Sequence, residues 1–237
     1  MKRDAEIKQK LFAIDLLKIL KENYTYEEIR KFLKLPVPVI SRYINGHVLP
    51  GFPRTQKIIK MFKEKYFFEI LKNKIVEVDE NIYDLSSFIR DIKIQKLTAK
   101  MIFNNLSFLK VDKVLTAATD GVPLSVFISD EFGVDLVIAT KEREVTTDVL
   151  EEKVMYLPGA ARYFYIPKNS IKPNESVLVV DDIVRTGLTL ESLIRFVNKS
   201  KGKVSGIFAV YEIDNILERL EKKHYLSCET KSYIKLK

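Results

Sequence analysis

The chain has 237 residues, of which 46% are hydrophobic and 30% are charged, a balance typical of a folded globular protein and not of a disordered one. No apolar run is long enough to span a bilayer, and the charged N-terminus lacks the apolar core of a signal peptide. The single cysteine, Cys228, excludes an internal disulfide and a thiolate-rich metal site. These features argue against a membrane partner and predict a cytoplasmic protein.

The net charge of +8 is confined to the N-terminal third of the chain. Residues 1–75 carry 17 Lys and Arg against 8 Asp and Glu, whereas the other 162 residues carry 23 basic and 24 acidic side chains. A small basic module joined to a near-neutral one indicates a polyanionic partner for the first module. We therefore expect two domains, at residues 1–73 and 74–237.

The N-terminal module is predicted to be all helical. Thr25 and Glu28 have the spacing of a capping box at the start of the second helix. Leu35-Pro36 ends that helix, because the residue before proline is pushed out of the α region, and Asn45-Gly46 ends the third. The spacing of apolar residues places the helices at 5–21, 26–33, 37–44 and 55–71.

Residues 25–46 have the form of a helix-turn-helix. Such a pair places its second helix in the major groove of double-stranded DNA, and Arg42 and Asn45 carry side chains suited to guanine and adenine edges. The predicted DNA-binding residues are Pro38, Ser41, Arg42 and Asn45 for the bases, and Lys31, Lys34, His47 and Arg54 for the phosphates. The alternative is a helical packing or dimerisation module with a solvated basic face.

The chain changes character after residue 74, where apolar β-branched runs alternate with helical patterns. This alternation predicts an α/β fold, in which helices cover a parallel sheet. A helical lead-in is expected over residues 81–110. The predicted strands are 111–117, 135–139, 163–167, 176–180 and 204–211, and the predicted helices between them are 123–132 and 189–200.

The segment VLVVDDIVRTGLT at 177–189 carries the strongest chemical signal. Asp181 and Asp182 follow a buried apolar strand, at the edge where open α/β sheets bind ligands. The turn from Arg185 to Thr189 directs backbone N–H groups and a helix N-terminus at one point, which suits a phosphate. Thr186 and Thr189 can donate to its oxygens, whereas the two carboxylates can accept from ribose hydroxyls or hold Mg²⁺.

This segment has two other interpretations. An apolar strand that ends in Asp-Asp also resembles the second motif of P-loop ATPases, but no glycine of this chain belongs to the G-x-x-x-x-G-K-[ST] loop that such proteins require. An ordinary strand–turn–helix with two solvated aspartates is the other alternative. The ordered run D-D-x-x-x-T-G-x-T favours the phosphate site over both.

At these residues the chain resembles the type I phosphoribosyltransferase family over roughly residues 80–215. The resemblance implies that Asp181 and Asp182 hold the ribose hydroxyls of phosphoribosyl pyrophosphate or a nucleotide. It also implies that Thr119, Asp120 and Gly121 face the pyrophosphate, although Ala117 stands near the position of a usual glycine. The residues implied to cradle the 5-phosphate are Val184, Arg185, Thr186, Gly187, Leu188 and Thr189.

The catalytic loop departs from the family pattern. Lys141 matches the first basic residue of the mobile loop in orotate-type members, but Glu144 and Thr146 stand at later basic positions. A carboxylate does not help a departing group that carries several negative charges. Arg143 can compensate, so Lys141 and Arg143 remain the catalytic candidates. Arg185 stands where purine-type members place an acidic residue.

We therefore expect a dimeric transcription regulator that senses a ligand and does not catalyse a reaction. The expected ligand is a nucleotide or phosphoribosyl pyrophosphate with a bound Mg²⁺. The segment from Leu35 to Gly46 resembles the recognition region of repressor-type helix-turn-helix proteins. The whole arrangement resembles purine repressors and archaeal regulators with an orotate phosphoribosyltransferase-like domain. The alternative is an active orotate or purine phosphoribosyltransferase with an N-terminal assembly or nucleic-acid-binding extension.

Overall fold

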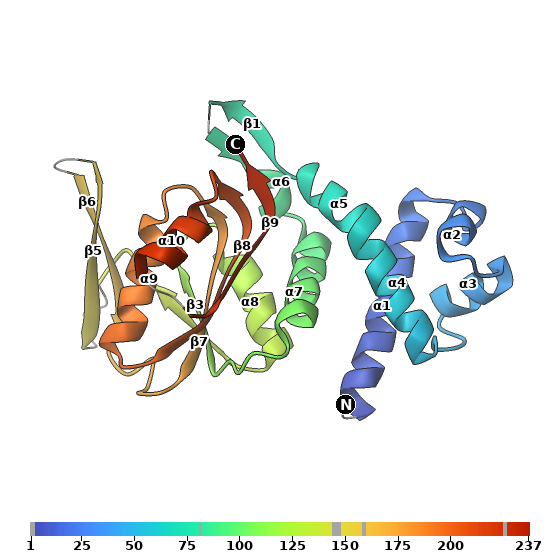
Figure 1. Cartoon of the computed structure of the whole chain (residues 1–237), viewed down its shortest axis with the longest axis horizontal. Helices are drawn as coiled ribbons and strands as arrows, with labels where there is room; N and C mark the ends of the chain where they lie inside the picture. Colours follow the sequence, from blue (N-terminus) through green and yellow to red (C-terminus); the bar gives the residue numbers. More distant parts are fainter. Residues whose placement is uncertain (1–2, 81, 144–147, 158–159, 225–226) are drawn as a thin grey trace. The chain divides into compact units, whose positions relative to one another are not determined.

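Figure 1 presents the computed structural model of the chain, which describes residues 3–80, 82–143, 148–157, 160–224 and 227–237. The chain divides into two compact units, Met1–Asn73 and Lys74–Lys237. Each unit contains fully buried apolar side chains, such as Ile29 in the first and Val179 in the second. Each therefore has a hydrophobic core of its own.

The first unit is all helical. Thr25 Oγ accepts a hydrogen bond from the Glu28 N–H at 3.3 Å, and the Thr25 N–H donates to Glu28 Oε2 at 2.8 Å. The predicted capping box is therefore confirmed. The helices are α1 (Arg3–Asn23), α2 (Tyr26–Leu33), α3 (Val37–Ile44), α4 (Phe52–Phe62) and α5 (Phe68–Lys72), with a π-helical turn η1 at Lys63–Phe67.

The long helix expected at 55–71 is wrong in two respects. It starts at Phe52, because Gly51 occupies the N-cap position and a proline is tolerated in the first turn of a helix. It is also interrupted by η1, in which Tyr66 is buried. The Tyr66 ring lies 5.0 Å from that of Tyr24 and 5.5 Å from that of Phe32, so this turn contributes to an aromatic cluster.

The second unit is built on a five-stranded parallel sheet in the order β4-β3-β7-β8-β9, which confirms the predicted α/β fold (Figure 1). Two separate hairpins accompany it. The sheet strands are β3 (Lys113–Ala117), β4 (Asp135–Ala139), β7 (Ser176–Val184), β8 (Lys203–Ile213) and β9 (Glu229–Leu236). The hairpins are β1 (Val76–Asp79) with β2 (Ile82–Asp84), and β5 (Val149–Leu157) with β6 (Ala160–Pro167). The helices are α6 (Ser86–Ile89), α7 (Ile92–Leu106), α8 (Val122–Phe132), α9 (Leu188–Lys199) and α10 (Ile216–His224).

Helices cover both faces of the sheet. Figure 1 shows α9 and α10 on one face and α7 and α8 on the other. Val177 and Val179 of β7 pack with Leu193 of α9 and Leu220 of α10 in one buried cluster. Because side chains alternate along a strand, Leu178 and Val180 point to the opposite face. Burial on both faces explains the continuous apolar run of this strand.

Three expectations about the second unit are wrong. The strand predicted to end at Val180 continues through Asp181 and Asp182 to Val184. The helical lead-in contains the strand β2 before the helices α6 and α7. The strand predicted at 163–167 lies in β6, which pairs antiparallel with β5 in a hairpin and is not a strand of the parallel sheet. The pattern of β5 is hidden in the sequence by its polar residues at 151–153. Among the described residues, no helix combines the length and apolarity needed to cross a membrane.

Candidate functional site

The sheet order brings two loops together at one edge. β3 is followed along the chain by β4 on one side, and the next sheet strand, β7, lies on the other side of β3. Reversal of the strand order at this point creates the crevice in which open α/β sheets bind ligands. The β3–β7 pairing stops at Leu115↔Val179, before either strand ends. The last residues of β3 and of β7 are therefore not paired with each other.

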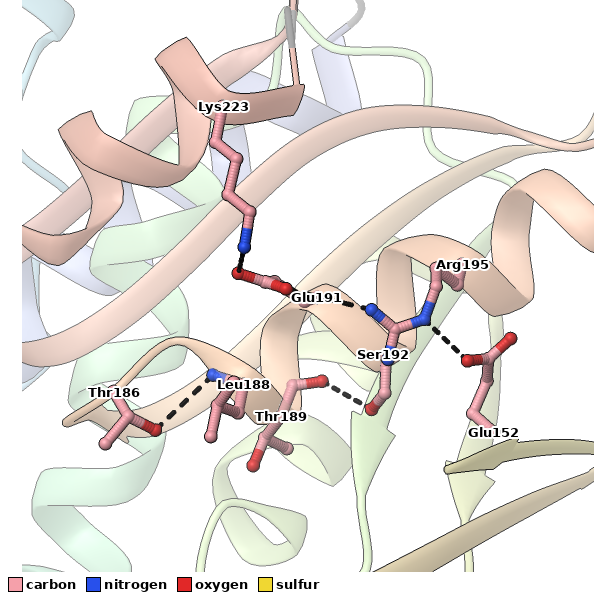
Figure 2. Close-up of polar contacts among 8 residues, drawn as sticks. All are labelled: Glu152, Thr186, Leu188, Thr189, Glu191, Ser192, Arg195 and Lys223. Atoms are coloured by element: carbon pink, nitrogen blue, oxygen red, sulfur yellow. Dashed lines mark hydrogen bonds and ion pairs between the residues drawn. The ribbon is translucent and has the colours of Figure 1, made fainter. Parts of the chain in front are cut away.

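The loop after β7 is the predicted phosphate-binding element. Gly187 has a left-handed backbone, with φ of +78°, and caps the N-terminus of α9. Thr186 Oγ accepts a hydrogen bond from the Leu188 N–H at 3.4 Å, as Figure 2 shows. A hydroxyl that accepts through one lone pair keeps its hydrogen for donation. A tight turn at the positive end of a helix dipole is suited to bind a phosphate.

Gly187 is also fixed by packing from α10. A Cβ added at this position would lie 3.0 Å from Leu220 Cδ1 and 3.1 Å from Ile216 Cγ1. The left-handed backbone and this close approach both favour glycine. The sequence predicts only a phosphate-binding role for Gly187, because α10 is not among the predicted helices.

The two aspartates of the site are buried. Asp181 is 6% exposed and Asp182 is 4% exposed, and the Asp182 N–H donates to Asp181 Oδ1 at 3.0 Å. Burial raises the pKa of both carboxyls, and the charge of the neighbouring aspartate adds to the rise at Asp181. A buried acidic pair of this kind is stabilised by hydrogen-bond donors or by a cation.

The predicted pyrophosphate loop approaches the same pair. A Cβ on Gly121 would lie 3.2 Å from Asp181 Oδ1 and 3.2 Å from the Asp182 nitrogen, so only glycine fits there without displacement. Thr119 is half-buried and Asp120 is exposed, and the charge of Asp120 further raises the pKa of both buried carboxyls. The structure therefore brings Gly121 and the aspartates together.

The catalytic candidates follow the neighbouring strand. Lys141 and Arg143 come directly after β4 and Thr140, and both are exposed. Arg143 lies near Tyr165 of β6, whose pKa is raised by burial and lowered in part by that guanidinium. Glu144 and Thr146, the two departures from the family pattern, lie outside the described residues.

The donor chemistry fits Mg²⁺ only in combination with a ligand. Asp181 and Asp182 supply carboxylate oxygens, which Mg²⁺ prefers. Within the described part of the chain, however, no group of three or more acidic, His or Cys side chains could hold a metal ion. Phosphate oxygens of a bound molecule would have to complete the coordination.

An ionic network that sequence reasoning missed surrounds α9 (Figure 2). Lys223 Nζ of α10 lies 2.7 Å from Glu191 Oε1 in the first turn of α9. Arg195 of α9 contacts Glu191 Oε2 at 3.7 Å and Glu152 Oε2 of β5 at 2.5 Å. Only Glu191 and Arg195 are close in sequence, four residues apart on α9. Lys223 lies 32 residues from Glu191, and Glu152 lies 43 residues from Arg195, so local spacing does not reveal these two contacts.

Arg185 has a partner on a distant strand. Its Nη2 donates to the backbone carbonyl of Tyr83 in β2 at 2.9 Å. The side chain thus contacts the β1–β2 hairpin, while the backbone remains part of the phosphate loop. Val184 is buried, and Leu188 and Thr189 are half-buried in the first turn of α9.

In the first unit, the predicted base-contacting residues lie on the short helix α3 and at its C-cap, Asn45. Pro38 and Arg42 are exposed on α3, Ser41 is half-buried, and Asn45 Nδ2 donates to Ser41 Oγ at 3.2 Å. Gly46 follows with φ of +74°, as expected for a helix end. Lys34 is also exposed and forms the left-handed C-cap of α2.

The other predicted phosphate contacts are spread around the helix pair. Lys31 and His47 are exposed. Arg54 is exposed as well, and its Nη1 donates to the Tyr43 hydroxyl at 2.8 Å. Because Tyr43 is a buried residue of α3, Arg54 links that helix to α4.

The fold defines an α/β domain that carries the predicted phosphate loop at the switch point of its sheet. The model of the phosphoribosyl transferase domain matches residues 80–235, and the chain belongs to this family. A solved adenine phosphoribosyltransferase from Thermoanaerobacter pseudethanolicus superposes with a TM-score of 0.63 over 71% of this chain and 99% of that one, at 22% identity. This likeness supports the fold.

The curated relatives include a regulator and enzymes. The purine biosynthesis transcriptional repressor PurR of Bacillus subtilis is 30% identical over 131 residues, which are 54% of this chain and 45% of that protein. The xanthine phosphoribosyltransferase of Alkaliphilus metalliredigens is 28% identical over 154 residues, which are 61% of this chain and 76% of that enzyme. The chain thus spans about half the length of the repressor.

Proposed function

We propose that this chain is a DNA-binding transcription regulator that senses phosphoribosyl pyrophosphate or a nucleotide through a non-catalytic phosphoribosyltransferase domain. The observation that carries the proposal is the presence, in one chain, of a basic helix pair and a buried acidic pair beside a phosphate loop. The similarity to a transcriptional repressor of purine biosynthesis supports it. A cytoplasmic location is part of the proposal.

The first unit supplies the proposed DNA contact. α2 and α3 are joined by a turn of three residues. Arg42 on α3 and Asn45 at its C-cap are exposed to solvent, as a recognition helix requires. Lys31, Lys34, His47 and Arg54 would contact phosphates and fix the register of the helix on the duplex. The excess of basic residues before position 75 supports a polyanionic partner for this unit.

The second unit supplies the proposed sensor. The loop Arg185–Thr189 would bind a 5-phosphate, and Asp181 and Asp182 would accept hydrogen bonds from the ribose hydroxyls. A ligand-bound Mg²⁺ would neutralise the buried carboxylates and the ligand phosphates together. Glu144 and Thr146 replace basic residues of the orotate-type loop, which favours binding without transfer.

A homodimer completes the proposal. Twofold symmetry would place two α3 helices about 34 Å apart, on successive turns of one face of a pseudo-palindromic site. The ligand changes DNA affinity only if it binds two conformations of the dimer unequally.

A gel-shift titration on the DNA upstream of the protein's own gene tests this function. We expect retardation at low salt, and a changed apparent affinity when phosphoribosyl pyrophosphate and Mg²⁺ are added. The double variant Arg42→Ala/Asn45→Ala is the matched control, because its exposed side chains leave the core intact. Absence of retardation by the unaltered protein at low salt, where electrostatic binding is strongest, would exclude DNA binding.

The relatives that are adenine and xanthine phosphoribosyltransferases support a second candidate, an active phosphoribosyltransferase. In that case Lys141 and Arg143 would stabilise the departing pyrophosphate. The test is incubation of the protein with phosphoribosyl pyrophosphate, Mg²⁺ and each nucleobase in turn, orotate included. Turnover that is lost in Lys141→Met would establish the enzyme, and no turnover with any base favours the sensor.

A further inference from the structure

The hairpin β1–β2 is held in place by few contacts. It forms a two-stranded sheet of its own, and all four residues of β1 are exposed. Val76 is 55% exposed and Val78 is 65% exposed. A lone two-stranded hairpin is marginally stable in water, so the order of this segment depends on the contacts that it makes with the rest of the second unit.

Tyr83 makes two of those contacts. It is the one buried residue of β2, at 8% exposure. Its hydroxyl donates to the backbone carbonyl of Lys237 at 2.8 Å, and its own backbone carbonyl accepts from Arg185 Nη2 at 2.9 Å. One residue of the hairpin is thus joined both to the end of β9 and to the phosphate loop.

These contacts connect the phosphate loop to the segment that follows the first unit. β1 begins at Val76, shortly after Asn73, the last residue of the first unit. Arg185 is the first residue of the loop that leads into Gly187 and α9. The Arg185 side chain therefore links the proposed ligand loop to the segment that directly follows the first unit.

We propose that Arg185 is a positioning residue that couples occupancy of the phosphate loop to the order of the strands β1 and β2. A ligand phosphate that binds the N–H groups of the loop fixes the backbone of Arg185, which in turn fixes the guanidinium against the Tyr83 carbonyl. The hairpin is the two-state element whose ordering the ligand favours. This inference rests on the proposed sensor function, because it assigns the route by which the bound ligand is reported.

Hydrogen–deuterium exchange of the full-length protein tests the coupling. In Arg185→Met, which keeps the side-chain stem and removes the donors, amides 76–84 should exchange about fivefold faster without any ligand. Arg219→Met, at an exposed arginine of α10, is the matched control and should leave this segment unchanged. Equal exchange at 76–84 in Arg185→Met and the unaltered protein would overturn the proposal.

Addition of phosphoribosyl pyrophosphate with Mg²⁺ separates coupling from direct ligand contact. In the unaltered protein, amides in both 185–189 and 76–84 should slow. In Arg185→Met, 185–189 should still slow, whereas 76–84 should not. If the variant loses affinity for the ligand and the hairpin is unaffected, Arg185 contacts the ligand directly and the proposal fails.

A second variant keeps the test independent of folding defects. Because Arg185 binds a backbone carbonyl, Tyr83→Phe should loosen the end of β9 and retain the slowing at 76–84 on ligand addition. Loss of that slowing in Tyr83→Phe would overturn the assignment to Arg185. If phosphoribosyl pyrophosphate protects nothing in the unaltered protein, the proposed sensor function fails, and the ligand-free comparison still decides whether Arg185 orders the hairpin.

Discussion

Lys223 Nζ on α10 lies 2.7 Å from Glu191 Oε1 in the first turn of α9. The Glu191 side chain is 11% exposed, and its other oxygen lies 3.7 Å from Arg195 Nη1. A carboxylate here stabilises the N-terminus of the helix, but it also competes with an anion bound by the same N-terminus. The two cations reduce this competition.

Lys223→Met is therefore expected to weaken phosphate binding without contact between Lys223 and the ligand. The Glu191 charge, then compensated by Arg195 alone, should lower affinity for ribose 5-phosphate about threefold to tenfold at low ionic strength, and less at high salt. Isothermal titration calorimetry of the full chain at two salt concentrations measures the change.

Two further variants make that prediction specific. Lys222→Met removes a neighbouring lysine that pairs with Glu218 at 2.8 Å on the same helix, and it should leave affinity unchanged. Glu191→Gln added to Lys223→Met should restore binding, because the repelling charge is gone. If Lys222→Met lost as much affinity for ribose 5-phosphate as Lys223→Met, the effect would come from α10 as a whole and not from the pair with Glu191.

Removal of the loop hydroxyls tests the phosphate site directly. Thr186→Ala and Thr189→Ala each delete a donor to a charged acceptor, which typically costs about 1.5–3 kcal/mol of binding free energy. Calorimetry with ribose 5-phosphate should show this loss, whereas Thr186→Ser and Thr189→Ser, which keep the hydroxyl, should bind nearly normally. Unchanged affinity in both alanine variants would place the 5-phosphate elsewhere.

The features of the fold and the site that the sequence predicts are those that depend on local spacing and on strand order. The capping box of Thr25 and Glu28, the turn at Gly46 and the run from Val177 to Thr189 are contiguous in sequence, so their chemistry is visible without coordinates. A parallel sheet then brings Gly121 near Asp181, since loops after neighbouring strands share one edge.

The remaining features depend on contacts between distant residues. Asp181 and Asp182 were expected at the end of their strand, but pairing with β8 continues past them and buries both. The contact from Arg185 to Tyr83 spans 102 residues. No local pattern fixes which backbone carbonyl an exposed arginine reaches, so such contacts cannot be read from one sequence.

The buried aspartates should make stability depend on pH. Their pKa values are raised above the value of about 3.9 in the unfolded chain. The folded state therefore binds protons more tightly, and stability is lost as pH rises from about 4 through the folded pKa. Asp181→Asn, which keeps the Oδ1 acceptor for the Asp182 N–H, removes one of these charges.

Asp181→Asn should therefore raise the melting temperature at pH 7.5. The rise should be about 2–4 °C for each kcal/mol gained in the free energy of unfolding. The gain should shrink at pH 5, where the unaltered pair is more protonated. Thermal denaturation at both pH values, without Mg²⁺ or ligand, measures the difference. A lower melting temperature at both values would mean that the Asp181 carboxylate is stabilised in the fold.

The helix pair predicts two different effects on DNA binding. Arg42→Ala should cost about 1–3 kcal/mol on the preferred site and relax its base preference. Lys31→Ala should weaken binding to all sequences similarly and lower the slope of log K against log salt by about 1. Fluorescence anisotropy over a salt series distinguishes them. Identical behaviour of the two variants on specific and random DNA would argue against base contact by α3.

Gly187 and Gly133 both have a positive φ but differ in how closely other atoms approach them. Gly187→Ala has to adopt φ of +78° and to place a methyl 3.0 Å from Leu220, whereas Gly133→Ala adopts φ of +68° with no atom within 4 Å. Backbone strain alone costs about 1–2 kcal/mol of unfolding free energy. Gly133→Ala should lose that amount in urea denaturation, and Gly187→Ala should lose about 1–3 kcal/mol more through overpacking. If both variants lose the same amount, α10 moves freely and does not fix the phosphate loop.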